Sequence, residues 1–502
     1  MELTDLEKQR VEKLEDLQET GIEGYPNRVD RSHTVAEAVA AFKTAEKEGE
    51  EPPSVTVTGR LRSIRTMGKI SFADIEDGTG TIQLFLRLSE MDSQVYEAFG
   101  ESFDLGDFVE AEGPLMRTRT GEISVLAQRL RMISKAVSPL PVIKEKEVDG
   151  KVVRYSSFSD VEERFRQRYA DLASNPDVRQ TFRTRACTIK AMRDFLDEHG
   201  FLEVETPILQ PIYGGAAATP FITHHHQLHQ DLYLRISFEL YLKRLLVGMY
   251  DRVYEIGRDF RNEGVSHKHN PEFTQMEFYA AYWDYRDVMN FCEEMVATVA
   301  EEATGSPVIT YQGQEIDLTP PWRRVTLRDI AREVTGIDYA EYPTANELSR
   351  VMEREGLPTP VGATWGHLID KGLLGTVEPT LIQPTFVLDY PRDISPLAKT
   401  KPEDPTHVER FEFFIGGLEM GNAFTELNDP FDQEERFEEM GRLYDPDDDE
   451  AHPMDEDYIR AMKYGMPPNG GFGIGVDRLV MLLTDQPNIR EVILFPLLRE
   501  RE

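Results

Sequence analysis

The chain has 502 residues and a formal net charge of −35, and 40% of its residues are hydrophobic. This apolar content excludes disorder over most of the chain, and the length suggests roughly two to four domains. No window approaches about 18 uninterrupted apolar residues, so we expect no membrane-spanning helix. The charged N-terminal segment does not resemble a signal peptide, and two cysteines cannot build a disulfide framework. We therefore expect a cytoplasmic protein.

The negative charge by itself argues against a nucleic-acid partner, because acidic proteins are repelled by a phosphate backbone. The charge is unevenly distributed, however. Residues 55–135 carry 10 basic and 12 acidic residues, whereas residues 432–457 carry 13 acidic and two basic ones. The first segment therefore remains a candidate for phosphate contacts, and the second is expected to be a surface excursion. The excess of acidic residues over the 16 lysines suggests adaptation to concentrated salt.

The first 50 residues show helical patterns. Thr4 with Glu7 and Thr34 with Glu37 form capping-box patterns, in which a Thr side chain and a Glu side chain satisfy each other's backbone amides. We expect a helical N-terminal extension over residues 1–50.

Residues 51–138 change to the alternation of apolar and polar residues that half-buried strands show, with glycine-containing turns between the runs. About five short strands in this span predict a small closed β-barrel. Residues 139–160 contain two prolines, a glycine and mixed charge, which predicts a linker. Residues 161–502 mix long helical windows with strands and are expected to form the largest domain.

Residues 252–282 predict a hairpin with a turn near Gly264. In its second strand, alternate residues share one face: Phe273, Gln275, Glu277 and Tyr279. Arg261 precedes the turn, and its planar guanidinium suits phosphate or carboxylate groups. The alternative interpretation is a sheet rim held by salt bridges.

Two carboxylates in residues 411–430, Glu412 and Glu419, are candidates for holding a divalent cation against phosphate oxygens. They are equally consistent with a general acid–base pair or with a structural role.

Three closely spaced glycines in residues 469–483 precede Asp477 and Arg478 and an apolar helix. Such glycines let a backbone or a ligand approach closely, although close packing is the simpler explanation. Their spacing does not match the dinucleotide-binding pattern. A buried Arg478 would need a partner.

A loop of small residues, 213–221, would let a substrate amine reach backbone carbonyls. A histidine cluster follows it: His224, His225, His226 and His229. A metal site is one interpretation, but the spacing fits no common template, and surface or structural histidines are the simpler one.

In this order, the segments resemble the three signature motifs of the class II aminoacyl-tRNA synthetases. The helix ending at Gly200 with the strand to Pro207 resembles the first motif, the 252–282 hairpin the second, and GFGIGVDR with Arg478 the third. The order and spacing of GGAAA, ELYLKRL, FRNEG, HNPEFT and NAFTELNDP are most similar to the lysyl-tRNA synthetase family. The resemblance implies an α+β chain, with an N-terminal OB-fold β-barrel for the anticodon before a class II catalytic domain. That domain has an antiparallel sheet flanked by helices.

The charge of the expected pocket agrees with an ammonium substrate. An aspartate-specific pocket would need a Lys or Arg at its end, whereas the candidates here are anions and acceptors: Glu239, Glu277, Glu426 and Tyr279. Removing one partner of a buried ion pair typically costs several kcal/mol, which supplies discrimination.

The resemblance also implies residue roles. The catalytic residues are Arg261 and Arg478. Lysine is bound by Gly215, Glu239, Arg261, Glu277, Tyr279, Asn422, Phe424 and Glu426. ATP is bound by Arg261, Glu263, Lys268, His269, Asn270, Phe273, Glu419 and Arg478. Glu412 and Glu419 ligate Mg²⁺, with up to three ions per site. In the barrel, Arg65, Phe72 and Gln83 contact an anticodon base, although Phe72 in the barrel core is the alternative.

The implied reaction is the ATP-dependent attachment of L-lysine to tRNA(Lys) through a lysyl-adenylate, with release of AMP and pyrophosphate. The first motif implies a homodimer. Two residues depart from the family pattern. Phe238 stands where the family usually has Pro, and Thr219 stands where a basic residue is usual. The alternatives are an aspartyl- or asparaginyl-tRNA synthetase of the same subgroup, or an enzyme that lysylates a translation factor. The barrel argues against the last.

Overall fold

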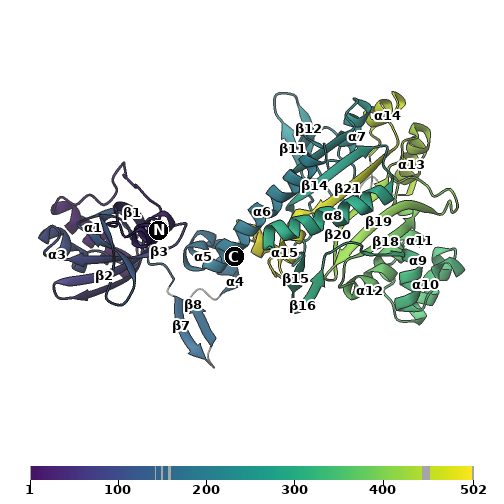
Figure 1. Cartoon of the computed structure of the whole chain (residues 1–502). Coiled ribbons are helices and arrows are strands. Elements are labelled where there is room, and N and C mark those ends of the chain that lie inside the picture. The colour runs from purple at the N-terminus through teal and green to yellow at the C-terminus, as the bar shows by residue number, and fades with distance from the viewer. Residues whose placement is uncertain (1, 142, 149–150, 157–159, 444–452, 500–502) are drawn as a thin grey trace. The chain divides into compact units, whose positions relative to one another are not determined.

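The computed structural model describes residues 2–141, 143–148, 151–156, 160–443 and 453–499. The chain separates into two compact units, Met1–Ser159 and Asp160–Glu502 (Figure 1). Among the described residues, no helix is long and apolar enough to cross a bilayer.

The first unit is built on a closed six-stranded barrel. Its strands are β1 (Ser54–Met67), β2 (Ile70–Glu76), β3 (Thr81–Arg87), β4 (Phe108–Arg117), β5 (Ile123–Ala127) and β6 (Arg129–Ser134). The order is β1-β2-β3-β5-β4-β6, and a β1–β4 pairing closes the barrel. Helix α3 (Ser93–Glu101) lies between β3 and β4 in sequence. The predicted OB-fold barrel is confirmed.

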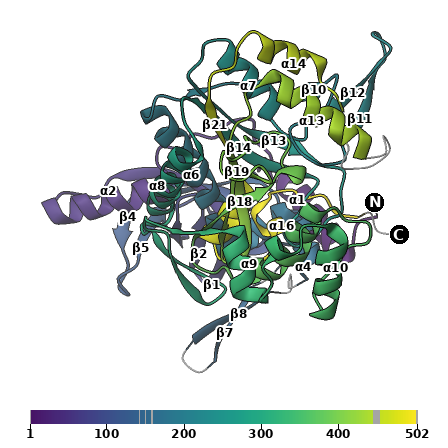
Figure 2. The same ribbon diagram turned by 90° about the vertical axis from the view of Figure 1, so that its right-hand side faces the viewer.

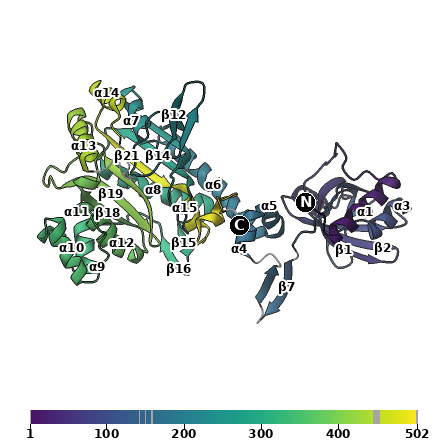
Figure 3. The same ribbon diagram turned by 180° about the vertical axis from the view of Figure 1, so that it is seen from behind.

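Two N-terminal helices, α1 (Asp5–Glu19) and α2 (Val35–Glu48), begin at Thr4 and Thr34, and both predicted capping boxes are present. Leu17 of α1 and Phe42 of α2 are buried in the same apolar core as the strands of the barrel. Figure 3 shows α1 lying against the barrel. The N-terminal extension is thus packed onto the barrel within one unit.

The segment expected to be a linker contains a two-stranded hairpin, β7 (Ile143–Val148) and β8 (Lys151–Ser156). Residues 142, 149–150 and 157–159 of that segment lie outside the described residues. The finer division of the chain at residues 50, 138 and 160 stays a prediction.

The second unit is built on an eight-stranded, mostly antiparallel sheet, as predicted. The strand order is β17-β18-β19-β20-β21-β14-β13-β9. The strands are β9 (Leu202–Glu203), β13 (Arg252–Phe260), β14 (Glu272–Ala281), β17 (Arg323–Thr326), β18 (Thr385–Pro391), β19 (His407–Ile415), β20 (Leu418–Thr425) and β21 (Asn469–Gly475). Only β9–β13 and β17–β18 pair in parallel. The strand expected up to Pro207 pairs over just two residues.

Helices cover one face of this sheet. They include α6 (Pro176–Glu198), α8 (Tyr285–Thr304) and α15 (Val476–Leu483), whose buried side chains share one core with β14, β19, β20 and β21 (Figure 1). The short α16 (Ile489–Val492) joins the same core. Gly200, at φ +75°, ends α6 as the sequence predicts.

Further elements surround the sheet. Helices α9 (Leu327–Thr335) and α10 (Ala345–Arg354) form a separate core beside β17 and β18 (Figure 2). Helices α7 (Glu239–Val247), α13 (Pro430–Leu443) and α14 (Glu456–Lys463) pack together. The others are α4 (Val161–Arg166), α5 (Arg168–Ser174), α11 (Trp365–His367), α12 (Gly375–Val377), β10 (Leu209–Gln210), β11 (Ile222–His225), β12 (Gln230–Leu234), β15 (Val308–Tyr311) and β16 (Gln314–Asp317). In the acidic run of residues 432–457, residues 432–443 belong to α13 and residues 456–457 begin α14, while residues 444–452 lie outside the described part. The expected surface excursion is wrong for the α13 part, because Phe437 and Met440 are buried there.

We expect Phe42→Ala to destabilise the N-terminal unit by about 3 kcal/mol, because a ring that is 3% exposed would leave a cavity between α2 and the barrel. Thermal unfolding followed by circular dichroism measures the change. The neighbouring exposed Lys43→Ala is the control and should be neutral. Equal melting temperatures for both variants would show that α2 does not stabilise the barrel.

Candidate active site

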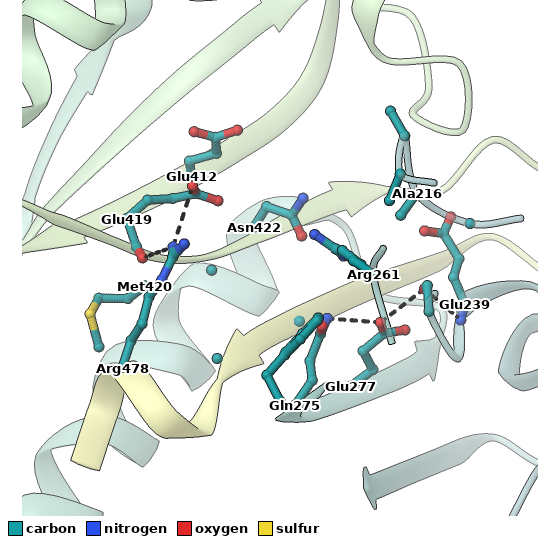
Figure 4. Close-up of a pocket in the computed structure, with 18 of the residues that line it drawn as sticks. Ala216, Glu239, Arg261, Gln275, Glu277, Glu412, Glu419, Met420, Asn422 and Arg478 are labelled. Carbon is teal, nitrogen blue, oxygen red and sulfur yellow. Dashed lines mark hydrogen bonds and ion pairs between the residues drawn. The ribbon is translucent and has the colours of Figure 1, made fainter. Parts of the chain in front are cut away.

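The face of the large sheet opposite to α6 and α8 bears a cavity of about 760 Å³. Strands β14, β20 and β21 form its floor, since residues from all three line it. The structure brings together in this cavity all the residues predicted for lysine, ATP and Mg²⁺: Gly215, Glu239, Arg261, Glu263, Lys268, His269, Asn270, Phe273, Glu277, Tyr279, Glu412, Glu419, Asn422, Phe424, Glu426 and Arg478. Figure 4 shows Glu239, Arg261, Glu277 and Asn422 at one side of it and Glu412, Glu419 and Arg478 at the other.

The three segments that resemble the signature motifs are tied together by one buried carboxylate. Asp477, 2% exposed at the start of α15, accepts a 2.5 Å hydrogen bond from Arg185 Nη1 in α6 and a 2.7 Å bond from the backbone amide of Thr274 in β14. Arg185 Nη2 also donates to Thr274 Oγ1 at 2.9 Å. The contacts fix α6, β14 and α15 relative to one another.

One end of the cavity is acidic and closed. Glu239, Glu277 and Glu426 are buried there, and burial raises the pKa of each carboxyl, whereas the charge of Lys243 lowers the pKa of Glu239 and Glu426. Glu277 accepts hydrogen bonds from Ser237 Oγ at 3.0 Å and from Gln275 Nε2 at 2.9 Å, and the Tyr279 hydroxyl donates to it at 3.3 Å.

Glycines let the backbone pack closely against these side chains. A Cβ at Gly471 would lie 2.0 Å from Glu426 Oε1 and 2.4 Å from the Tyr279 ring. Glu426 Oε1 has no hydrogen-bond partner among the described residues. Gly215, at φ +89°, lies against Glu239 and Ser237. Glu426 and Tyr279 both line the cavity, so the unpaired oxygen of Glu426 is an acceptor for a donor with several N–H groups.

The middle of the cavity is cationic. The Arg261 guanidinium lies 5.1 Å from the centre of the Phe273 ring, and its Nη2 donates to the Ile236 carbonyl at 3.4 Å. Its buried Nε has no partner among the described residues. Asn422 lies across from it in Figure 4. Arg261 therefore retains donors for an incoming carboxylate or phosphate.

The other end of the cavity carries the remaining candidates. Arg478 donates to the Glu419 carbonyl at 2.5 Å and to His269 Nε2 at 3.2 Å. Burial, with Arg478 and Lys268 nearby, lowers the pKa of His269 to about 4, so this ring is neutral at pH 7. Lys268 is paired with Glu378 at 2.7 Å. Asn270 Oδ1 is buried without a partner within the described structure, and Glu263 is exposed.

Glu412 and Glu419 lie on the adjacent strands β19 and β20. Arg410 pairs with Glu412 at 2.6 Å. Burial, followed by repulsion from Glu419 and Asp370, raises the pKa of Glu412 to about 8. A cation between these carboxylates would relieve the repulsion. Over the described residues, no group of three or more His, Cys, Asp or Glu is placed to hold a metal by itself. The pair therefore suits Mg²⁺, which binds one or two carboxylates together with substrate phosphates.

The histidine cluster lies on the exposed β11–β12 hairpin, where His224 pairs with Asp231 at 2.7 Å. It contributes nothing to the cavity. Phe238, the residue in place of the usual Pro, is fully buried under the Arg235 guanidinium, 4.0 Å from its ring centre. Gly257 leaves room for this stack, because a Cβ there would meet both side chains. The Thr219 carbonyl accepts from the Asn262 amide at 2.8 Å.

Sequence reasoning gave no role to three residues that shape the acidic end: Ser237, Lys243 and Arg410. Lys243 follows Glu239 by four residues on α7, so the two lie on one face of that helix. From the sequence alone, this four-residue spacing could have indicated an ion pair between Glu239 and Lys243.

In the barrel, Phe72 lies outside the apolar core. Its ring stacks on Phe85, with centroids 4.9 Å apart. Arg65 is its cross-strand partner on β1, and Gln83 on β3 accepts from Ser124 at 3.0 Å. Arg65, Phe72 and Gln83 thus share the outer face of neighbouring strands, whereas Ala73 and Leu84 point into the core.

Comparison with known proteins agrees with this architecture. Residues 160–499 match the family "tRNA synthetases class II (D, K and N)", and residues 55–133 match the "OB-fold nucleic acid binding domain". The chain therefore belongs to the class II tRNA synthetases.

Similar proteins indicate which family within this class the chain belongs to. The lysine–tRNA ligase of Roseiflexus castenholzii is 53% identical over all of both chains. That of Chloroflexus aurantiacus is 52% identical over all of this chain and 99% of the relative, and that of Moorella thermoacetica is 51% identical over 99% and 98%. Within its class, the chain is a member of the lysine–tRNA ligase family.

We expect Asp477→Asn to lower the free energy of unfolding by about 3 kcal/mol, since Arg185 would be left half-buried without its anionic partner. Chemical denaturation monitored by Trp fluorescence measures this change. Glu301→Gln, at an exposed position of α8, is the control. A loss below about 1 kcal/mol would contradict the central role of Asp477.

Proposed function

We propose that this chain attaches L-lysine to tRNA(Lys) at the expense of ATP, through a lysyl-adenylate, with release of AMP and pyrophosphate. The observation that carries the proposal is the acidic end of the cavity, which three buried carboxylates line. The buried cation at this end, Lys243, is neutralised by Glu239 and Glu426. It is therefore unavailable as the counter-ion that an aspartate side chain would need.

Lysine is proposed to bind with its ε-ammonium between Glu426 and Tyr279, near Glu277. Glu239 and the Gly215 carbonyl take the α-ammonium. Arg261 and Asn422 hold the carboxylate, and Phe424 borders the aliphatic chain. The placement is supported by the unpartnered Oε1 of Glu426 and by the cavity that Glu277, Tyr279 and Glu426 line.

ATP is proposed to bind at the other end, with its adenine between Phe273 and Arg478. Asn270 and Glu263 lie toward the edge of the base, and Asn270 Oδ1 has its acceptor capacity free. Lys268 and the neutral His269 meet the outer phosphates. Glu412 and Glu419 would hold Mg²⁺, up to three ions, which neutralises phosphate charge when bound.

Adenylate formation depends on how the two substrates are positioned, and it needs no proton transfer to activate the nucleophile. The lysine carboxylate is already a nucleophile and attacks the α-phosphate in line, with pyrophosphate leaving. Arg261 is proposed to contact both the attacking carboxylate and the α-phosphate, and so to stabilise the charge as it moves between them. The terminal adenosine of tRNA then attacks the carbonyl of the adenylate.

The proposed tRNA contact in the first unit is the outer face with Arg65, Phe72 and Gln83. A stacked, half-exposed ring beside an arginine suits an unpaired anticodon base. We further propose a homodimer formed through α6 and the segment after it, because Leu202, Ile208 and Leu209 are 47%, 46% and 51% exposed. A cytoplasmic location fits these substrates.

Arg261→Ala should abolish lysine-dependent ATP–pyrophosphate exchange, because the α-phosphate and the carboxylate both lose their counter-ion. The matched control is Arg258→Ala on the same hairpin arm, whose long 3.7 Å contact with Glu272 is exposed. Near-normal exchange by Arg261→Ala would contradict the assignment.

Glu426→Gln should raise the KM for lysine about 100-fold and change the KM for ATP less than about threefold, because the change removes the anion facing the ε-ammonium. Exchange kinetics measure both constants. Glu434→Gln removes a surface ion pair with Lys463 and should change neither. Equal effects on both substrates would argue against the proposed orientation of lysine.

Phe72→Ala should lower kcat/KM for tRNA about 10- to 100-fold, the value of one base stack, and leave pyrophosphate exchange unchanged. Aminoacylation with tRNA(Lys) transcripts measures the first and exchange the second. Met67→Ala, 60% exposed on β1, is the control. An unaltered tRNA response would remove Phe72 from the interface.

A further inference from the structure

Lys243 occupies an unusual place for a lysine. It lies on α7 behind the acidic end of the cavity, and its side chain is 0% exposed. Its Nζ is 2.5 Å from Glu239 Oε1 and also pairs with Glu426 Oε2. These are the two carboxylates proposed for the α- and ε-ammonium groups of the substrate.

Each carboxylate gives only one oxygen to Lys243. Lys243 contacts Oε2 of Glu426 and Oε1 of Glu239, and Oε1 of Glu426 has no hydrogen-bond partner among the described residues. The cation therefore leaves the second oxygen of each carboxylate for the substrate. One side chain thus connects both ends of the lysine-binding site from behind.

The cluster needs a positive charge. Glu239, Glu277 and Glu426 are buried together, and burial favours their neutral forms. A protonated carboxyl would lose the charge that attracts an ammonium. Lys243 opposes this effect, since its charge lowers the pKa of both Glu239 and Glu426.

The other groups around Lys243 do not replace it. From β14, the Tyr279 ring centre is 5.9 Å from Nζ, and the phenol of Tyr458 on α14 is also buried nearby. Arg410 on β19 acts on Glu239 from a distance but pairs with Glu412, and Arg244 on α7 pairs with Asp455. Lys243 is the cation in direct contact with both carboxylates.

We propose that Lys243 is a positioning residue for lysine recognition, which holds Glu239 and Glu426 ionised and correctly oriented before the substrate arrives. This inference rests on the proposed function. It makes recognition of the two substrate ammonium groups depend on a single buried side chain. Lys243 itself does not touch the reacting atoms.

The test is lysine-dependent ATP–pyrophosphate exchange by the full chain between pH 6 and 9.5. Lys243→Met should raise the KM for lysine about 100-fold at pH 7 and change the KM for ATP less than about threefold. Without the cation, the carboxyls ionise at higher pH. The acidic limb of kcat/KM for lysine should therefore move upward by at least about one pH unit. Lys243→Arg, which keeps the charge, should retain the wild-type pH profile.

Lys135→Met is a matched control. Lys135 in the first unit is also fully buried and bridges two carboxylates, Asp104 at 2.6 Å and Asp107 at 2.9 Å. Its loss should lower the melting temperature without moving the lysine KM or the pH profile. If Lys243→Met shows no cooperative melting transition, Lys243→Gln takes its place, with the same expected shift.

The outcomes separate the two proposals. If the wild-type chain shows no exchange with lysine, the proposed function fails. If the wild type is active but the neutral variants at 243 keep its lysine KM and pH profile, only the inference about Lys243 is overturned. A shifted profile in Lys243→Arg would also overturn it.

Discussion

The arrangement of the catalytic unit depends on the buried contact of Asp477 with Arg185 and Thr274. Three segments that are far apart in sequence meet at this carboxylate. One carries the helix behind the sheet, one the hairpin with Arg261, and one the helix with Arg478. The segments that carry the two arginines are thus joined through a residue that has only 2% of its surface exposed.

The cavity is arranged as a gradient of charge along the sheet. Carboxylates close one end, Arg261 stands in the middle, and Arg478 with Lys268 lies at the other end beside Glu419. A substrate with an ammonium side chain, a carboxylate and a partner phosphate matches this sequence of charges from end to end. Burial strengthens the interactions at the acidic end, where Glu239, Glu277 and Glu426 are screened little by water.

Much of the fold, and the set of residues in the cavity, could be predicted from the sequence. The capping boxes at Thr4 and Thr34, the end of α6 at Gly200 and the 252–282 hairpin are local signals, and the structure has each of them. The motifs also identified residues that the fold gathers into one cavity. The roles of these residues stay proposals.

Other features could not be predicted because they depend on tertiary contacts. Nothing local shows that Lys243 is fully buried between Glu239 and Glu426, or that Arg235 stacks on Phe238. The hairpin of β7 and β8 follows a Pro-rich stretch that resembles a linker. The sequence did not decide whether Phe72 points outward, because the alternation of apolar and polar residues does not say which face of a barrel strand is inside.

The stacking of Phe72 on Phe85 has a consequence for affinity. An exposed aromatic ring normally loses rotational freedom when a base packs on it, and ordering such a side chain costs about 0.5–1.5 kcal/mol. Here the ring is already held at an interplanar angle of 14° by its neighbour. Most of that entropy is lost during folding, so a base that stacked on Phe72, as proposed, would meet an ordered ring and more of the stacking energy would remain for binding.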